Sequence, residues 1–265
     1  KIMFKKLRSL IGKLFNENQQ MIIVMYLSDF FWFLRKYFLS VIIEYPPEFI
    51  ENWTAIRKNS SQDKERNFTV YQMIKVHNEI FKNKKTSIIE FGVDRGGTLT
   101  TICKFVKNET EIFALDSFGF YADDIKDNVT NYDSHYLGKY RPFTKQTRFK
   151  EFDYLSLEKQ LNQVLIRKNS QLDIIKCHFP DKIDEKYLKK INSKKYSFVH
   201  IDFDLYKPTI EAIKFIKPKL ENGAIILLDD YNFINQEGVK QAVKDSGINI
   251  NKCIQTQSGQ LICYT

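Results

Sequence analysis

The chain has 265 residues, of which 43% are hydrophobic and 28% are charged. These proportions are ordinary for a folded globular protein and exclude a largely disordered chain. The 41 lysines and arginines exceed the 32 acidic residues, which gives a formal net charge of +9. The basic residues are scattered and form no tract with interleaved aromatic residues, so we expect a solvated lysine surface and no nucleic-acid partner.

Residues 1–80 are predicted to form a helical extension that serves in dimerisation or as a lid. Segment 21–43 is strongly apolar, but charged residues interrupt it, and no uncharged run reaches the roughly 18 residues of a bilayer span. No small-residue cleavage site follows it, which argues against a secretory signal. We therefore expect no transmembrane span, and buried or dimer-forming helices in a homodimer. After the break at Pro46-Pro47, a further helix is expected over about 70–81.

The four cysteines are widely separated in the sequence and include no CxxC pair. This spacing is typical neither of a zinc knuckle nor of a dense disulfide framework. Reduced thiols in a cytoplasmic protein are the expectation.

Residues 81–265 show short apolar runs that alternate with amphipathic stretches. This alternation predicts an α/β fold with a Rossmann-like, doubly wound, seven-stranded and mostly parallel sheet that ends in an antiparallel edge hairpin. The expected strands are Ser87–Phe91, Ile112–Leu115, Leu172–Ile175, Phe198–Ile201, Ala224–Leu228, and a terminal pair near Ile248–Ile254 and Gln260–Tyr264. The polar, aromatic-rich insert at about 118–152 is too long for a plain connection and is interpreted as a lid.

A glycine-rich turn follows the first of these strands. The strand ends in Glu90, the turn holds Gly92 and Gly96, and a helix is expected from Thr98. The pattern G-x-x-x-G-G is neither the dinucleotide motif G-x-G-x-x-G nor a P-loop. A carboxylate just before the first glycine suits the amino group or sulfonium of S-adenosylmethionine better than a pyrophosphate. A glycine turn alone is weak evidence, because any α/β protein can use one as a tight connection.

The next expected strand ends in Asp116, which is 26 residues after Glu90. An acidic residue at the tip of the adjacent strand can accept hydrogen bonds from both ribose hydroxyls of a nucleoside. The competing interpretation is a helix N-cap. Together with the glycine turn, Asp116 favours a nucleoside cofactor.

Two further strands end in pairs of carboxylates, Asp202 with Asp204 and Asp229 with Asp230. If both strands are parallel, these side chains meet at the carboxyl edge of the sheet, where such folds bind ligands. Converging carboxylates repel unless a cation neutralises them, and oxygen ligands of this kind suit Mg²⁺ or Mn²⁺. A single acidic pair is often a cap or a solvated turn, but two at neighbouring strand ends predict a metal site.

The ordered motifs EFGVDRGGT, ALDSF, KCHFPD, HIDFDLYKPT, ILLDDY and GVKQAV resemble the macrocin O-methyltransferase family. The resemblance runs from about residue 70 to the C-terminus, and it implies metal-dependent methylation of sugar hydroxyls. The sequence departs from the family at Lys176-Cys177 and in the 118–152 insert. The resemblance implies cofactor contacts by Glu90, Gly92, Asp116 and Ser117. Gly96 and Thr98 belong to the same glycine turn and are also expected to contact the cofactor. The resemblance implies that the metal is bound by Asp202, Asp229 and Asp230.

The expected catalytic residues are Asp202 and Asp204. Catechol-type relatives place a lysine base where this chain has Leu205, so one of the two carboxylates is the better candidate for the base. The expected acceptor is a sugar or sugar-containing metabolite, with or without a linked nucleotide. Three alternatives remain open: a glycosyltransferase that uses Asp202-Phe203-Asp204 as a DxD motif, a catechol or phenol O-methyltransferase, and a non-catalytic protein that kept the fold.

Overall fold

The computed structural model describes residues 44–119, 130–133, 152–233 and 236–265. Residues Tyr45–Thr265 form one compact unit. Within this unit, helix Lys64–Ile80 packs on the sheet and helix Pro47–Lys58 packs on other helices. The predicted division between 1–80 and 81–265 stays a prediction. Segment 21–43 and most of the predicted lid lie outside the described residues. No helix in the described ranges is long and apolar enough to cross a membrane.

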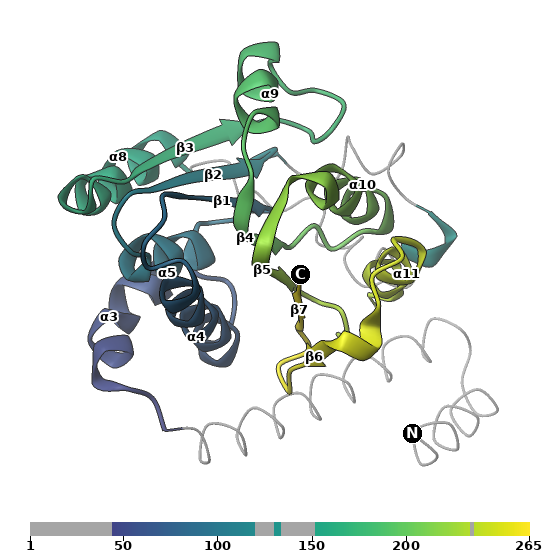
Figure 1. Ribbon diagram of the computed structural model, residues 1–265, viewed down its shortest axis with the longest axis horizontal. Coiled ribbons are helices and arrows are strands. Elements are labelled where there is room, and N and C mark those ends of the chain that lie inside the picture. Colours follow the sequence, from purple (N-terminus) through teal and green to yellow (C-terminus); the bar gives the residue numbers. More distant parts are fainter. Residues whose placement is uncertain (1–43, 120–129, 134–151, 234–235) are drawn as a thin grey trace. The chain divides into compact units, whose positions relative to one another are not determined.

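The unit is built on one seven-stranded sheet with the strand order β3-β2-β1-β4-β5-β7-β6 (Figure 1). The five strands from β3 to β5 pair in parallel, and β7 pairs antiparallel with both β5 and β6. This is the predicted doubly wound sheet with an antiparallel edge pair, so the fold prediction is confirmed. The strands are β1 (Thr86–Phe91), β2 (Thr110–Asp116), β3 (Gln171–Lys176), β4 (Tyr196–Ile201), β5 (Leu220–Leu228), β6 (Cys253–Gln255) and β7 (Leu261–Tyr264).

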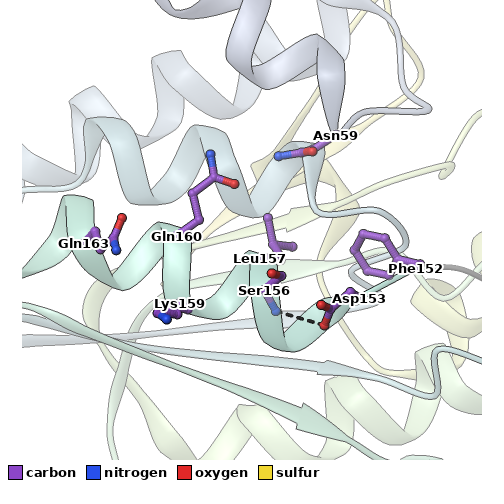
Figure 2. A pocket seen from close by; sticks show the side chains of 8 residues that line it. All are labelled: Asn59, Phe152, Asp153, Ser156, Leu157, Lys159, Gln160 and Gln163. Atoms are coloured by element: carbon purple, nitrogen blue, oxygen red, sulfur yellow. Dashed lines mark hydrogen bonds between the residues drawn. The ribbon is translucent and has the colours of Figure 1, made fainter.

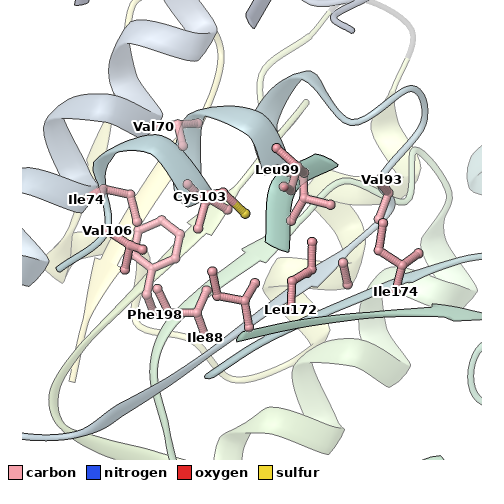
Figure 3. Close-up of a cluster of buried hydrophobic side chains, with 14 of the residues drawn as sticks. Val70, Ile74, Ile88, Val93, Leu99, Cys103, Val106, Leu172, Ile174 and Phe198 are labelled. Atoms are coloured by element: carbon pink, nitrogen blue, oxygen red, sulfur yellow. The ribbon is translucent and has the colours of Figure 1, made fainter. Parts of the chain in front are cut away.

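Helices cover both faces of the sheet (Figure 1). A separate apolar cluster is buried on each side, and Figure 3 shows one of the two. Side chains from α4, α5 and α8 pack on the face that carries Ile88 and Phe198, and those from α9, α10 and α11 pack on the other. The helices are α3 (Pro47–Lys58), α4 (Lys64–Ile80), α5 (Gly97–Phe105), α8 (Tyr154–Leu165), α9 (Glu185–Asn192), α10 (Tyr206–Ile216) and α11 (Glu237–Asp245). Short 3₁₀ turns span Asn131–Asp133, Ile166–Lys168, Lys217–Lys219 and Ile250–Lys252.

Helix α4 starts earlier than the sequence predicts, and its cap explains the difference. The side chain of Asp63 accepts a hydrogen bond from the backbone N–H of Arg66 at 3.0 Å. This bond satisfies one of the free donors of the first turn and starts the helix at Lys64. The apolar pattern that predicts a helix becomes regular only at Val70, six residues further on. Pro47, in turn, opens α3, where its missing N–H costs no hydrogen bond.

A buried histidine joins α4 to the sheet. His77 is fully buried, and its Nε2 lies 2.8 Å from the hydroxyl of Ser197 on β4. That hydroxyl donates to the carbonyl of Ser87, so it accepts a hydrogen bond from His77, which places the ring proton on Nε2. Burial lowers the pKa of His77 from 6.5 to about 4. The folded protein therefore holds this ring neutral.

The stability of the fold should fall in mild acid because of His77. Its pKa is lower in the folded state than in the unfolded chain, so the unfolded state binds more protons between about pH 6.5 and pH 4. The free energy of unfolding should therefore be highest above pH 6.5. It should decrease by up to about 3 kcal/mol as the pH falls from 6.5 to about 4. Urea unfolding of wild type and H77Q across the window measures the difference, with H178Q as the control. An equal acid dependence in wild type and H77Q contradicts this account.

Candidate active site

The glycines of the turn after β1 allow other parts of the chain to approach the turn closely. Gly92 has a φ of +85°, and a Cβ placed on it would lie 2.0 Å from the backbone oxygen of Asp202. Gly96, also at +85°, has no room for a Cβ because the Leu157 side chain of α8 lies 2.4 Å from that position. Glycine is required at both positions by backbone conformation and by close packing. The turn thus brings β1, β4 and α8 close together at one place.

Asp116 at the tip of β2 holds this turn in shape. Its Oδ2 accepts the backbone N–H groups of Val93 at 2.7 Å and Asp94 at 2.9 Å. Its Oδ1 accepts the N–H of Phe118 at 2.7 Å. The carboxylate is partly exposed and caps no helix, so the N-cap interpretation is wrong. Ser117 beside it is also partly exposed, and its hydroxyl accepts the N–H of Gly119 at 3.3 Å. Ribose binding by Asp116 stays a prediction.

Glu90 is completely buried and forms a pair with a histidine of the next strand. The register of β1 and β4 sets Glu90 opposite His200, and Glu90 Oε1 lies 3.0 Å from His200 Nδ1. Burial raises the pKa of Glu90, and His200 opposes part of that rise. The other oxygen of Glu90 and the Nε2 of His200 have no partner among the described residues. The predicted contact of Glu90 with a cofactor stays a prediction.

The two acidic pairs meet at the carboxyl edge of the sheet, as the sequence predicts. The ladder continues past the strand ends: Asp202 N–H donates to Phe91 O at 2.7 Å, and Asp229 N–H donates to Ile201 O at 2.9 Å. Oxygens of Asp202 and Asp229 lie within 4.8 Å of each other and of a ring nitrogen of His200. Oxygens of Asp202, Asp204 and Asp230 form a second such group. The parallel register therefore places all four carboxylates at one edge.

Two residues that the sequence analysis missed contact these carboxylates. Arg66, in the first turn of α4, pairs with Asp229 Oδ2 at 3.2 Å and with Asp230 Oδ1 at 2.6 Å. Gln62, just before α4, donates from its one Nε2 to Asp202 Oδ2 at 2.7 Å and to Asp229 Oδ2 at 2.6 Å. The sequence contains a pattern that could have identified Arg66. It precedes Val70 by four residues and Ile74 by eight, a helical spacing that places its charge on the buried face of α4.

Burial and mutual repulsion dominate the electrostatics of the cluster. Burial raises the pKa of Asp202 well above its usual value, and repulsion by Asp229, Asp230 and Asp204 adds to the rise. Burial also raises the pKa of Asp229, although Arg66 opposes it. For Asp230, burial alone would raise the pKa, but the guanidinium and several hydrogen bonds outweigh it, and the pKa is lowered. One guanidinium thus faces four carboxylates, and their charge is only partly balanced.

Asp204 lies in a strained backbone conformation beside the cluster. Its φ is +60°, in the left-handed region that non-glycine residues seldom adopt, and Asp230 is similar at +56°. Gln236 donates to Asp204 Oδ1 at 2.7 Å and thereby orients this carboxylate. Within the predicted lid, Asp133 is described and buried, and its Oδ1 accepts the N–H of Tyr206 at 3.0 Å. One part of the insert therefore caps α10, which begins directly after the cluster.

The residues of the cluster suit a divalent cation. They supply carboxylate oxygens, the ligands that Mg²⁺ and Mn²⁺ prefer. Asp229 is 1% exposed, and its Oδ1 has no hydrogen-bond partner among the described residues. A buried carboxylate oxygen without a donor is costly, and a cation at this edge would satisfy it. Asp202 belongs to both groups of possible ligands, whereas Asp229 and Asp230 belong to one group each, so a metal site formed by Asp202, Asp229 and Asp230 together stays a prediction.

A hollow of about 350 Å³ lies beside the glycine turn, and none of the four carboxylates lines it (Figure 2). Asn59 lines one side, and the first turns of α8 from Asp153 to Gln163 line the other. Leu157 of this lining also packs on Gly96, so the hollow borders the turn that is expected to bind the cofactor. The size suits a small ligand, but the hollow is open and contains no residue predicted to act in catalysis.

Comparison with known proteins identifies the domain that carries these features. Residues 89–231, more than half of the chain, match the family model described as "Methyltransferase domain". The O-methyltransferase NovP has a similar structure, with a TM-score of 0.56 and 18% identity over 78% of this chain and 81% of NovP. CalS11, a calicheamicin methyltransferase, gives a TM-score of 0.50 and 18% identity over 84% of this chain and 94% of its own. No curated protein matches the sequence.

Replacing Gly92 with alanine should damage the site through its backbone. The new Cβ would meet the Asp202 carbonyl oxygen 2.0 Å away, in addition to the strain of a positive φ. Gly223 is the matched control, because its φ of +81° is similar and its nearest foreign atom is a side-chain carbon 3.4 Å away. Urea unfolding should show a loss of about 1 kcal/mol for G223A and roughly 3 kcal/mol for G92A. Equal losses would show that crowding at Gly92 has no effect.

Proposed function

Because the chain belongs to the methyltransferase-domain family, we propose that it is an S-adenosylmethionine-dependent O-methyltransferase assisted by Mg²⁺ or Mn²⁺. Family membership confirms the enzyme class that the sequence predicts. The observation that carries the finer proposal is the meeting of Asp202, Asp204, Asp229 and Asp230 beside the glycine turn. Transfer to oxygen needs a group that deprotonates a hydroxyl next to the methyl donor, and this edge offers one.

The acceptor in this proposal is a hydroxyl of a sugar or sugar-containing metabolite, with or without a linked nucleotide. The support is the motif resemblance to the macrocin O-methyltransferase family, in particular HIDFDLYKPT and ILLDDY. NovP is named as an O-methyltransferase, which agrees with an oxygen acceptor. A catechol or phenol acceptor uses the same chemistry, so an acceptor screen distinguishes the two. The glycosyltransferase alternative finds no support in the family match.

Asp204 is the residue that removes the proton in this mechanism. It is partly exposed at the strand end, and the Gln236 amide at 2.7 Å holds one of its oxygens in place. The acceptor O–H gives its proton to Asp204, and the oxygen lone pair forms the new bond to carbon. S-adenosylmethionine held at the glycine turn would supply the methyl group and would leave as the neutral thioether, with the electrons of the broken S–C bond on sulfur. A divalent cation held by Asp202, Asp229 and Asp230 would supply positive charge that would lower the pKa of the acceptor hydroxyl.

Cofactor contacts are assigned to the turn and the two strand tips. Asp116 and Ser117 lie at the partly exposed tip of β2, where a ribose would be recognised. Gly92, Gly96 and Thr98 shape the start of α5, whose first N–H groups lie at the same edge. Glu90 acts from the buried layer beneath this surface, where it is paired with His200.

Calorimetric titration tests the cofactor and the class of donor. S-adenosylhomocysteine should bind with micromolar affinity. UDP- and GDP-sugars, each titrated with and without Mg²⁺, test the glycosyltransferase alternative, which requires a nucleotide sugar to bind with Mg²⁺ and S-adenosylhomocysteine not to bind. Micromolar binding of S-adenosylhomocysteine would justify a screen of sugar and catechol acceptors. If S-adenosylhomocysteine does not bind and a nucleotide sugar binds tightly only with Mg²⁺, the methyltransferase proposal fails.

Replacing Asp229 with alanine should separate turnover from cofactor binding. The variant loses one predicted cation ligand, so we expect methyl transfer to an accepted substrate to fall at least about 100-fold. Affinity for S-adenosylhomocysteine should stay within about threefold of wild type, because Asp229 follows β5, and β4 lies between β5 and β1, the strand that the glycine turn follows. D181N is the control, since Asp181 is exposed and outside the cluster. Loss of S-adenosylhomocysteine binding in D229A would argue against the metal role.

A further inference from the structure

The side chain of Gln62 occupies the place between two carboxylates that a cation would bind. Its single amide nitrogen lies 2.7 Å from Asp202 Oδ2 and 2.6 Å from Asp229 Oδ2. An amide NH₂ group has two protons, and here each one is donated to a different carboxylate. Gln62 therefore neutralises part of the repulsion between Asp202 and Asp229 in the absence of an ion.

The other end of the same amide contacts the glycine turn. Gln62 Oε1 accepts a hydrogen bond from the hydroxyl of Thr98 at 3.1 Å. Thr98 is in the first turn of α5, and its side chain is buried. A threonine hydroxyl can either donate or accept, so it can pair with an amide oxygen or with an amide nitrogen. The Thr98 contact is thus compatible with both orientations of the Gln62 amide.

We propose that Gln62 is a fourth residue of the divalent-cation site. In this proposal its side-chain amide group flips when the cation binds, so that the amide oxygen and nitrogen exchange positions. With no cation present, the NH₂ group faces the two carboxylates. With a cation present, the carbonyl oxygen faces the ion, because the N–H protons would be repelled by its charge and an amide oxygen is a good ligand for it. Thr98 then accepts a hydrogen bond from the amide nitrogen, so the contact between Gln62 and Thr98 is kept.

Arg66 stays in place in both states. Its bonds go to Asp229 Oδ2 and to Asp230 Oδ1, which leaves Asp229 Oδ1 without a donor and free for the ion. Helix α4 holds the arginine, because its backbone N–H is bound by the Asp63 cap and its guanidinium lies 4.8 Å from the Phe233 ring. The cation adds to the charge of Arg66 and replaces only the amide protons of Gln62.

This inference rests on the proposed function, because it requires a cation at the carboxylate cluster. It also links the two halves of the site. The Gln62 amide, which changes orientation when the cation binds, is hydrogen-bonded to Thr98. Thr98 is at the start of the helix expected to bind the cofactor. Cation binding therefore reverses a hydrogen bond at the cofactor turn.

The test uses Mn²⁺ alone, titrated into the full chain and followed by electron paramagnetic resonance and calorimetry. Q62L, which keeps the approximate shape and removes the oxygen, should weaken Mn²⁺ binding about tenfold. Q62E, which supplies a carboxylate oxygen at the same reach, should bind Mn²⁺ more tightly than wild type. T98V should weaken binding less than Q62L, because the flipped amide loses its partner but keeps its oxygen. Q171L is the matched control, since Gln171 is exposed on β3.

Whether Q62L lowers or raises the affinity for Mn²⁺ decides the proposal. If the amide were only displaced by the cation, its removal would remove a competitor, and Q62L would bind Mn²⁺ more tightly or unchanged. Either result overturns the ligand role of Gln62 while the metal site stands. If wild type itself binds no Mn²⁺, both the metal part of the proposed function and this inference fail. Circular dichroism and the binding of Mn²⁺ by Q62E show that the segment before α4 still folds in the variants.

Discussion

The meeting of four carboxylates at the ends of β4 and β5 is the constraint on which the rest of the site depends. A parallel sheet brings these side chains together, and their repulsion must be balanced for the edge to stay folded. Arg66 supplies a full charge and Gln62 supplies two polarised protons, both from the start of α4. The Asp63 cap that begins this helix therefore also sets the position of the groups that neutralise the site.

The glycine turn and the carboxylate cluster are parts of one hydrogen-bonded ladder. Gly92 N–H donates to Leu115 O, Asp202 N–H donates to Phe91 O, and Asp229 N–H donates to Ile201 O. These bonds extend the sheet by one residue past its strands and join the tips of four neighbouring strands. Because hydrogen bonds join these tips, a displacement of one strand end would move its neighbour with it. The ladder could therefore hold a methyl donor and an acceptor at a constant separation.

Much of this arrangement could be predicted from the printed residues. The alternation of apolar runs and amphipathic stretches predicts the sheet, and strand ends marked by Glu90, Asp116, Asp202 and Asp229 predict where ligands bind. Three features could not be predicted in this way. Asp116 braces the glycine turn through backbone N–H groups, Glu90 is buried against His200, and Gln62 lies between two carboxylates. Each is a contact between residues more than 20 positions apart, which local pattern does not encode.

The sequence by itself determined the strand runs, the glycines that a crowded turn requires, and the acidic residues at the strand ends, because periodicity and residue type act over short distances. Only the tertiary structure decided which of these side chains meet and which groups balance their charge. Strand order sets Asp202 beside Asp229 although 26 residues separate them in the chain, and the packing of α4 over that edge brings in Arg66 and Gln62. Charge balance at a buried site is a property of the assembled fold, since it depends on every element that packs there.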